Sequence, residues 1–473
     1  MVHSESQPAR PVRIDLRVRR GGAPRTLHAA VGLLGFMCVA SSALAAEIPS
    51  DPRALRRTRV VEVFENWKES VVFVTGPVAR SEKQSPAEFF VTDPKGPVEN
   101  SLGTGFVIHE SGYVVTNAHG VEKTLAPVVV LADRRQMPAD PVGLLHDQDL
   151  ALLKVHGGGP LKAVRLARSG DLMIGETVVV IANPHGLLYT CTSGVLSAIG
   201  RATHLADVPG VTLQDMIQSD AGINPGSSGG PWFNVAGEVM GMTASMKKDA
   251  ENIAFAVSAT TLRKLLPAML DVERRYRIAS GLAIAPDGPC EVQSVLPGSP
   301  AAKAGLRPSD AITRLADRPT PTSLDFHLAL VGRKPGEALA VEFTRQGAPQ
   351  TALLVLAERP KLDPKAVLRE KLGIEGAVLD PKMAKAMGLL SARAVLVASV
   401  NDAFYGNVQH KPRPGDVLAR IGLIRPRNPE HAAELVETLQ PGQAVDLVYL
   451  RRRENTATRI DVHLVLPAAP HAP

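Results

Sequence analysis

Short apolar runs, separated by turn-forming residues, place the strongest limit on how this chain can fold. Between Gly103 and Val257, β-branched and aliphatic residues gather in short segments that Gly, Asp and Asn separate. The clearest of these segments are Tyr113–Thr116, Val128–Leu131, Leu150–Val155 and Val178–Ile181. Strands at this spacing predict an all-β barrel or sandwich. After it, the pattern from Thr260 to Tyr276 indicates a helix that leads into a charged linker.

The C-terminal part of the chain repeats itself. Two motifs recur at an offset of 106 residues: Arg307–Asp310 with Arg413–Asp416, and Lys334–Glu337 with Gln440–Gln443. In each copy a helical pattern lies between the motifs and a strand pattern follows the second one. Because two separate motifs keep their spacing, chance similarity is a poor explanation. We expect two copies of one module, at about 279–358 and 366–467.

The N-terminal segment has the layout of an export signal. Six arginines precede an apolar run from Ala29 to Ala40, and Ala43–Ala45 fits a small-residue cleavage site. The apolar run is short for a membrane span, which favours cleavage. Residues 1–45 are therefore predicted to be a signal peptide, with a retained N-terminal anchor as the alternative.

The composition of the chain limits the classes of partner and cofactor that we expect it to bind. With 473 residues, 45% of them hydrophobic and 21% charged, it resembles an ordinary globular protein of about three domains. Most of the net charge of +6 lies in the signal segment, and only 4% of the residues are aromatic. No nucleic-acid partner is therefore expected. The histidines show no metal-ligand spacing and no phosphate-binding loop follows a strand, so we expect neither metal nor cofactor. Cys191 and Cys290 are expected to be buried and unpaired.

The run Gly226–Pro231 places a serine among small residues that can turn sharply and bring backbone N–H groups close to it. A nucleophile that attacks a carbonyl needs such an environment, although an isolated run of this kind is often only a flexible turn. Two upstream residues favour the catalytic interpretation. His119 follows one predicted strand, and Asp149 begins another.

A serine hydroxyl is a poor nucleophile unless a base takes its proton, and a neutral histidine has a suitable pKa for that role. A buried aspartate would hold the imidazole in the right tautomer and stabilise it once charged. We therefore predict Ser228 as nucleophile, His119 as base and Asp149 as the orienting acid. Asp147 is a competitor for the acid, and Asp149 is preferred because it directly begins the apolar strand.

An oxyanion hole is predicted in the same loop. The backbone N–H groups of Gly226 and Ser228, with Ser227 between them, would face the oxygen that becomes negative during acyl transfer. Losing one such donor typically lowers the rate by ~10²–10³.

Several of these segments, in this order, resemble the HtrA/Deg serine proteases. They are Gly103–Ile108, Val115–His119, Asp149–Lys154, Asn183–Pro184, Thr192–Ser197 and Ile223–Pro231. The repeated modules resemble the PDZ domains of that family, so the resemblance covers about 60–467. It implies a mainly β fold: a chymotrypsin-like double β-barrel over 60–270, followed by two small α+β PDZ-like domains.

This chain departs from the family pattern beside two of the predicted catalytic residues. Ser227 stands where the family usually has Asn before the nucleophile, and Gly120 stands where an apolar residue usually follows the histidine. Neither change removes a predicted catalytic group.

The resemblance also implies a substrate pocket. In trypsin-like enzymes that cut after basic residues, an acid sits six positions before the nucleophile, and here that position is Gly222. Without a buried carboxylate, the pocket cannot pair with a Lys or Arg side chain. Ile223 matches an apolar position of the family's pocket, and Met246 is expected to line the same pocket. We expect small to medium aliphatic P1 residues such as Val, Ala or Leu.

The first repeated module carries Ser280–Ile284, which resembles the carboxylate-binding loop of PDZ domains. Gly281 and Leu282 are expected to receive the C terminus of a peptide that adds as a strand. Leu328 and Val331 are either walls of that groove or ordinary core residues. In the second module, Leu372–Ile374 has a comparable position, but the Ser-Pro-Ala-Ala-Lys-Ala-Gly stretch of the first module is missing there. Docking or assembly is therefore as good an interpretation as peptide binding.

A regulatory element is also implied. Arg201 would begin a sensor loop over 201–216 that responds to PDZ occupancy or substrate, and a solvated surface arginine is the alternative.

The resemblance implies an exported, ATP-independent endopeptidase that degrades misfolded or damaged proteins in the periplasm or cell envelope. Its partners would be unfolded polypeptides, together with C-terminal peptides at the first PDZ domain. The functional unit would be a homotrimer or a larger cage of trimers. The alternative is a non-catalytic or weakly catalytic chaperone or peptide-binding scaffold, whose barrel holds clients without cutting them.

Overall fold

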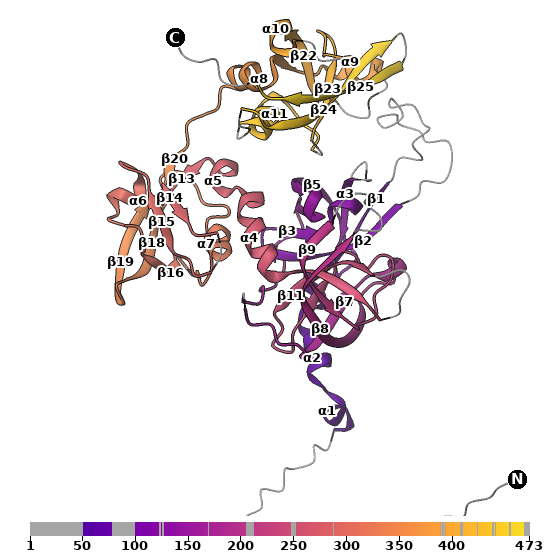
Figure 1. Ribbon diagram of the computed structural model, residues 1–473, viewed down its shortest axis with the longest axis vertical. Coiled ribbons are helices and arrows are strands. Elements are labelled where there is room, and N and C mark those ends of the chain that lie inside the picture. Colours follow the sequence, from indigo (N-terminus) through magenta and orange to yellow (C-terminus); the bar gives the residue numbers. More distant parts are fainter. Residues whose placement is uncertain are drawn as a thin grey trace, which may run out of the picture. The chain divides into compact units, whose positions relative to one another are not determined.

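The computed structural model describes residues 51–467 with several gaps (Figure 1). The gaps are 78–99, 123, 125–126, 169, 205–211, 247–251, 287, 388, 390–391, 393, 407–409, 423, 438, 440 and 454–455. The predicted signal peptide at 1–45 lies outside the described residues. Within the described part of the chain, no helix combines the length and the hydropathy that a membrane span requires.

Two closed β-barrels follow one another along the chain (Figure 1). The first has the strand order β1-β2-β3-β6-β5-β4 and the second the order β10-β11-β12-β9-β8-β7, with antiparallel pairing throughout. The strands of the first barrel are β1 Val71–Pro77, β2 Asn100–His109, β3 Tyr113–Thr116, β4 Val128–Val130, β5 Gln136–Leu145 and β6 Leu150–Val155. Those of the second are β7 Thr177–Ala182, β8 Thr190–His204, β9 Thr212–Ser219, β10 Pro231–Phe233, β11 Val239–Met246 and β12 Ala254–Ser258.

The apolar runs of the sequence become the buried strands of these barrels. Every residue of β3 is buried, and five of the six residues of β6 are buried. Such strands remove a large apolar area from water, which is the main favourable contribution to folding. The double-barrel prediction is thereby confirmed.

Short helices precede, connect and follow the barrel strands in the sequence. They are α1 Pro52–Arg56, α2 Arg59–Trp67, η1 Lys68–Ser70, α3 Ala118–Glu122, η3 His146–Gln148, η4 Pro184–Gly186, α4 Ala259–Leu270 and α5 Val272–Arg275. The α2 helix begins at Thr58, whose hydroxyl accepts a hydrogen bond from the Val61 amide. At its other end the Trp67 ring stacks on Phe233, with 6.0 Å between ring centres. This contact fixes α2 on the second barrel.

Two small α+β modules make up the rest of the described chain. The first contains β13 Ile278–Ala279, β14 Leu282–Ile284, β15 Val292–Val295, α6 Pro300–Lys303, β16 Ala311–Leu315, β17 Arg318–Pro319, α7 Ser323–Ala329, β18 Ala338–Arg345, β19 Ala348–Val355 and β20 Ala357–Glu358. The second contains α8 Pro364–Leu372, β21 Ile374–Val378, α9 Pro381–Ala386, β22 Val395–Val400, α10 Asp402–Tyr405, β23 Val417–Ile421, α11 Pro429–Val436, β24 Ala444–Arg453 and β25 Thr456–Val465.

The structure confirms the internal repeat that the sequence predicted. Strand β23 begins 106 residues after β16, and β24 begins 106 residues after β18. The pairing order β16-β18-β19 of the first module recurs as β23-β24-β25 in the second. The predicted helices between the motifs are α7 and α11.

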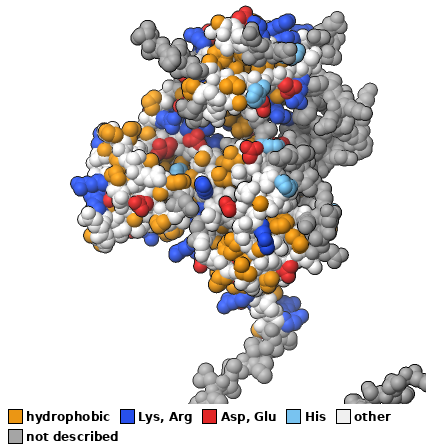
Figure 2. Space-filling view, viewed as in Figure 1, with side chains coloured by type: hydrophobic (Ala, Val, Ile, Leu, Met, Phe, Trp, Pro, Cys, Tyr) orange, Lys and Arg blue, Asp and Glu red, His pale blue; other side chains and the backbone are white. Residues whose placement is uncertain are grey.

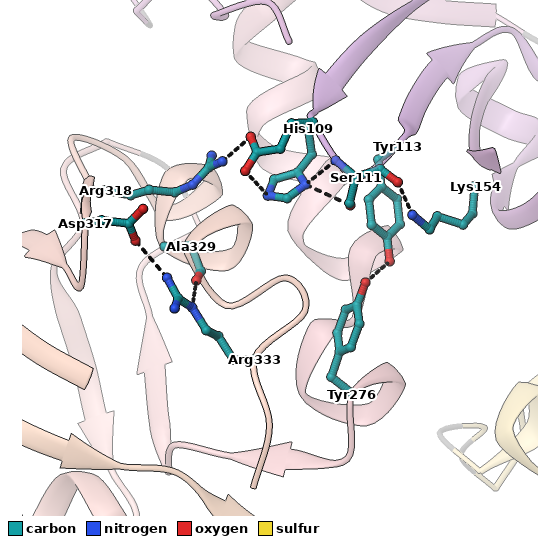
Figure 3. Close-up of polar contacts among 10 residues, drawn as sticks. His109, Ser111, Tyr113, Lys154, Tyr276, Asp317, Arg318, Ala329 and Arg333 are labelled. Atoms are coloured by element: carbon teal, nitrogen blue, oxygen red, sulfur yellow. Dashed lines mark hydrogen bonds and ion pairs between the residues drawn. The ribbon is translucent and has the colours of Figure 1, made fainter. Parts of the chain in front are cut away.

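Polar contacts link the first module to the first barrel (Figure 3). Arg318 of β17 forms an ion pair with Glu110, just after β2. The hydroxyl of Tyr113 lies 3.1 Å from that of Tyr276, in the linker after α5. His109 is only 4% exposed. The buried apolar residues of the second barrel, α4 and the first module also form one continuous cluster. These contacts tie the module to the barrels.

Charged and apolar side chains are mixed on the surface. On the face that Figure 2 shows, basic and acidic side chains are interspersed with apolar ones over the described residues.

One expectation about cysteine was wrong. Cys290 is buried as predicted, but Cys191 is exposed. Cys191 occupies an outward-facing position of β8, where exposed and partly buried residues alternate along the strand.

Candidate active site

His119 and Asp149 form a hydrogen-bonded pair at the end of the first barrel. The imidazole Nδ1 of His119 lies 2.8 Å from Oδ2 and 2.9 Å from Oδ1 of the carboxylate. The backbone N–H of His119 also donates to Oδ1 over 3.0 Å. The Asp149 side chain is 1% exposed and that of His119 is 16% exposed. Because the carboxylate accepts from Nδ1, the opposite ring nitrogen is the one that can exchange a proton with a hydroxyl.

The local backbone explains why Asp149 reaches this position. The 3-10 turn η3 ends at Asp149, which adopts a left-handed conformation with φ of 47° before β6 begins. Asp147, the competing candidate, lies within η3. His146 is instead paired with Glu122, with 3.0 Å between Nδ1 and Oε1. The preference for Asp149 over Asp147 thus agrees with the geometry.

Ser228 and His119 line the same small cavity at the junction of the two barrels. Its other lining residues are Val74, Gly103, Thr116, Asn117, Gly120 and Val121. The backbone carbonyl of Ser228 accepts a hydrogen bond of 2.8 Å from the Thr104 amide, which fixes the serine loop against β2. The chain therefore brings the three predicted catalytic residues to one place, although 109 positions separate His119 from Ser228.

The loop before Ser228 is closed by its own hydrogen bonds. The Ser227 amide donates to the Asn224 carbonyl over 2.8 Å, and the Ser227 hydroxyl accepts from the Asn224 amide over 3.2 Å. This corrects one prediction, because the Ser227 amide is used inside the turn and is not a donor for the oxyanion hole. Among the described residues, the amides of Gly226 and Ser228 donate no hydrogen bond. The Ser227 side chain, unusual at this position, holds the turn closed.

A buried network joins this loop to the rest of the barrels. The Thr104 hydroxyl donates to the Gly226 carbonyl over 2.7 Å and accepts from the Asn183 amide over 2.9 Å. The Asn183 side chain in turn donates to the Val72 carbonyl over 3.0 Å. The sequence-based prediction assigned no role to Thr104 or Asn183. Both lie inside segments that it compared with the HtrA/Deg family, and their complete burial was not visible there.

The carbonyl of Pro225 accepts a hydrogen bond of 2.9 Å from the His185 amide, which sets the orientation of the Pro225–Gly226 peptide. Since the carbonyl and N–H of a trans peptide point in opposite directions, the Gly226 N–H points away from η4. A side chain could not replace the hydrogen of Gly226. Its φ is +95°, and an added Cβ would lie 2.9 Å from backbone atoms of Asn183 and His185.

Comparisons with known proteins identify the types of domain in this chain and its family. A model of the trypsin-like peptidase domain matches residues 103–242, and a PDZ domain model matches residues 252–356. A solved HtrA-type protease, AlgW with decapeptide, is 25% identical, covers 64% of this chain and 99% of its own, and has a TM-score of 0.38. A probable periplasmic serine endoprotease, DegP-like, from Ectopseudomonas mendocina is 30% identical over 379 residues, which are 74% of this chain and 78% of the relative. The chain belongs to the HtrA/DegP-like family of serine endoproteases.

A relative of the same description from Hahella chejuensis is 30% identical over 396 residues, 77% of this chain and 81% of its own. As a member of this family with the trypsin-like domain, the protein is a serine endopeptidase. The relatives from Pseudomonas fulva and Ectopseudomonas mendocina are named periplasmic. The PDZ domain and the family together support binding of peptide substrates.

Two residues predicted to form the substrate pocket of this HtrA-type protease are Ile223, before Ser228 in the sequence, and Met246, after it. Ile223 is partly buried and packs on the core of the second barrel. Met246 ends β11 and is 37% exposed. Gly222, which directly precedes Ile223, is exposed, and its carbonyl accepts a hydrogen bond of 2.8 Å from the Thr192 hydroxyl.

In the PDZ module, Gly281 directly precedes β14 and Leu282 is the first residue of that strand. Gly281 has φ of +77°, and the Leu282 amide donates to the Ser280 hydroxyl over 3.1 Å. Within the described chain, β14 pairs only with β15, so its second edge has no strand partner there. Leu328 and Val331 are 9% and 8% exposed and belong to the hydrophobic core. Their burial favours the core-packing alternative.

The predicted sensor loop has a different form. Residues 201–204 belong to β8 and 212–216 to β9, with Arg201 paired with Met216 in register. Arg201 therefore sits on an exposed strand, and the segment 205–211 lies outside the described residues.

Proposed function

We propose that Ser228, His119 and Asp149 form the catalytic triad of this endopeptidase. The observation that carries the proposal is the buried Asp149 carboxylate, bonded to His119 Nδ1, beside a cavity that Ser228 shares. Ser228 Oγ attacks the scissile carbonyl carbon while His119 takes its proton. Asp149 stabilises the imidazolium through the Nδ1–H bond. His119 then protonates the leaving amine. In the second half of the reaction, His119 takes a proton from the water that attacks the acyl-serine ester and returns it to Ser228 Oγ.

The developing negative charge would fall on the carbonyl oxygen of the substrate. We propose that the amides of Gly226 and Ser228 receive it, since neither donates to a described residue. The hydrogen bond from His185 to Pro225 supports this assignment because it orients the Gly226 amide before substrate arrives. Electrostatic stabilisation of this kind is usually the largest single contribution to such catalysis.

Covalent labelling tests the assignment of the nucleophile. A fluorophosphonate should modify Ser228 in the wild-type protein, because activated serines of this type attack phosphorus. Mass mapping should locate the adduct on the peptide that contains Ser228. The adduct should be absent from His119→Ala, and it should remain in His204→Ala, which changes an exposed histidine of the second barrel. Adduct formation elsewhere, with Ser228 unmodified, would refute the assignment.

We also propose an aliphatic P1 preference. Gly222 brings no carboxylate to the pocket, and Ile223 and Met246 offer apolar surface beside the serine loop. A Lys or Arg side chain would lose its water there without gaining a charged partner. A cleavage-site profile on an unfolded protein should show mainly Val, Ala and Leu at P1. A profile dominated by Arg or Lys would contradict the proposal.

The proposed biological role is ATP-independent degradation of misfolded or damaged proteins in the periplasm or cell envelope, after export directed by residues 1–45. Unfolded chains expose apolar side chains and extended backbone, and both suit a cleft between barrels and a sheet edge. The names of the relatives support this compartment. We propose that the protease domain spans residues 60–270 and that the PDZ domains span 279–358 and 366–467. The chain is proposed to assemble as a homotrimer or larger homo-oligomer.

The two PDZ modules are proposed to differ in function. The free edge of β14 and the positive φ of Gly281 support binding of peptide C termini at the first module. Binding of a peptide there would regulate the protease. Arg201 is the proposed regulatory residue that responds to this binding. In the second, the corresponding Gly373 is covered by Phe404: a Cβ added at Gly373 would lie 2.4 Å from the ring. Docking or assembly is proposed for the second module, because the Ser-Pro-Ala-Ala-Lys-Ala-Gly stretch of the first is missing there. A labelled C-terminal peptide should lose binding in Gly281→Val and keep it in Gly373→Val.

A further inference from the structure

The side-chain amide of Asn117 makes two contacts with Asp149. Its Nδ2 donates to carboxylate Oδ2 over 2.9 Å and to the backbone carbonyl of the same residue over 3.1 Å. Asn117 lies between β3 and α3, two positions before His119, and is 2% exposed. Both amide protons of Asn117 therefore point to the residue that holds His119.

The carbonyl end of the same amide differs from its donor end. Among the described residues, Oδ1 of Asn117 is buried without a hydrogen bond. An unpaired buried oxygen is unfavourable, so an apolar side chain of similar size would suit the packing better. The reversed orientation would place this oxygen against the Asp149 carboxylate. The two donors of the amide, and not its volume, therefore explain why Asn is suited to this position.

We propose that Asn117 is a positioning residue for catalysis, acting through Asp149. The inference rests on the roles proposed above for His119 and Asp149. His119 and Asn117 both donate hydrogen bonds to the Asp149 carboxylate. Asn117 fixes the rotation of the carboxylate, and its second bond holds the left-handed backbone of Asp149.

Asn117 also reduces the negative charge that the Asp149 carboxylate presents to the imidazole of His119. A hydrogen bond donated to a carboxylate disperses its negative charge, so the pair binds an additional proton less strongly. Removing the Asn117 amide should therefore cause the His119–Asp149 pair to release its additional proton only at a higher pH. The acid side of the pH profile of kcat/KM should then shift upward, because only the form with a neutral imidazole accepts the proton of Ser228.

The test compares Asn117→Leu and Asn117→Ala in the full chain. For each variant, kcat/KM on a peptide substrate is measured from pH 5 to 9, and thermal unfolding confirms the fold. We expect kcat/KM to fall roughly 10- to 100-fold, as for loss of a hydrogen bond to a charged group. The acid-side midpoint should rise by about half a pH unit.

Thr124→Val is the matched control. The Thr124 hydroxyl is also buried and donates to the Val121 carbonyl over 2.7 Å, just after α3, without contacting Asp149. Its loss should leave the acid-side midpoint in place. If Asn117→Leu does not fold, Asn117→Ala decides, because Ala introduces no bulk.

Wild-type activity in a folded Asn117 variant, or a lower rate with an unmoved midpoint, would overturn the inference. Ser228→Ala, measured in parallel, separates this failure from failure of the proposed triad. If Ser228→Ala is inactive while the Asn117 variants behave as wild type, only the role of Asn117 is wrong. If Ser228→Ala keeps full activity, the triad itself is wrong.

Discussion

Arg345 donates two hydrogen bonds to the buried carboxylate of Asp310, over 2.7 and 2.8 Å. Burial alone would raise the pKa of Asp310, but the hydrogen bonds from Arg345 and from the Arg307 amide outweigh it, so this pKa lies below its ordinary value. In the second module Arg451 contacts Asp416 in the same way, over 2.9 and 2.8 Å. In the first module the Arg–Asp pair thus joins the turn before β16 to β18, and in the second it joins the turn before β23 to β24.

Replacing Arg345 should destabilise the first PDZ module. The Arg345→Ala variant leaves the Asp310 carboxylate buried without its main partner, and we expect a loss of roughly 2 kcal/mol in the free energy of unfolding. Urea unfolding measures it. Arg314→Ala is the control, because Arg314 is more exposed, on β16 of the same sheet, and its ion pair with Glu342 spans 3.6 Å. Equal effects of the two substitutions would contradict the structural role of the pair.

His109 lies between the first barrel and the first PDZ module (Figure 3). Its Nδ1 accepts from the Ser111 amide over 3.1 Å, which requires the neutral ring. Burial lowers the pKa of His109 to about 4; Glu110 and the Leu328 carbonyl raise it, while Arg318 and Lys154 lower it further. In the unfolded chain the same group titrates near its ordinary value of about 6.5.

Acid should therefore weaken the fold. Between the two pKa values the unfolded chain binds more protons than the folded one, so stability falls as the pH falls from about 6.5 toward 4. For His109 the loss is about 2 kcal/mol at pH 5. In His109→Gln the melting temperature should fall less between pH 7 and 5 than in the wild type. His204→Gln, in an exposed position, should keep the wild-type slope. An unchanged slope in His109→Gln would show that this burial does not control acid stability.

Gly229 follows the proposed nucleophile and tolerates no side chain. Its φ is +82°, and an added Cβ would lie 2.0 Å from the Thr104 carbonyl oxygen. Gly229→Ala should therefore shift the serine loop and lower kcat/KM at least ~100-fold, since small displacements of reacting groups have effects of that order. Gly170→Ala is the control, because it has a similar φ of +79° and open space around it. Comparable activity of both variants would contradict the importance of this contact.

Much of the architecture could be predicted from local patterns. The apolar runs at Tyr113–Thr116 and Leu150–Val155 became β3 and β6 without a change of bounds, because strands buried on both faces need continuous apolar residues. The module repeat followed from motif spacing. The predicted burial of Cys191 was wrong, and so was the loop assignment of 201–204 and 212–216, because the course of β8 depends on pairing with β7 and β9, partners that local sequence does not reveal.

The candidate site was partly predictable for a similar reason. His119, Asp149 and Ser228 were identified from residue type, order and resemblance. The Thr104–Asn183 network and the contact of Asn117 with Asp149 were not, because they depend on how distant strands pack. The use of the Ser227 amide within its own turn is a matter of backbone geometry that residue types do not specify.

The central claim is that Ser228 cuts peptide bonds with the help of His119 and Asp149. Casein hydrolysis by the wild type and by a folded Ser228→Ala variant tests it most directly, with Ser197→Ala, an exposed serine on β8, as the control. We predict that hydrolysis disappears in Ser228→Ala, falling by at least ~10⁴-fold, and persists in Ser197→Ala. Undiminished hydrolysis in Ser228→Ala would contradict the account, and a wild-type protein that holds casein without cutting it would favour the scaffold alternative.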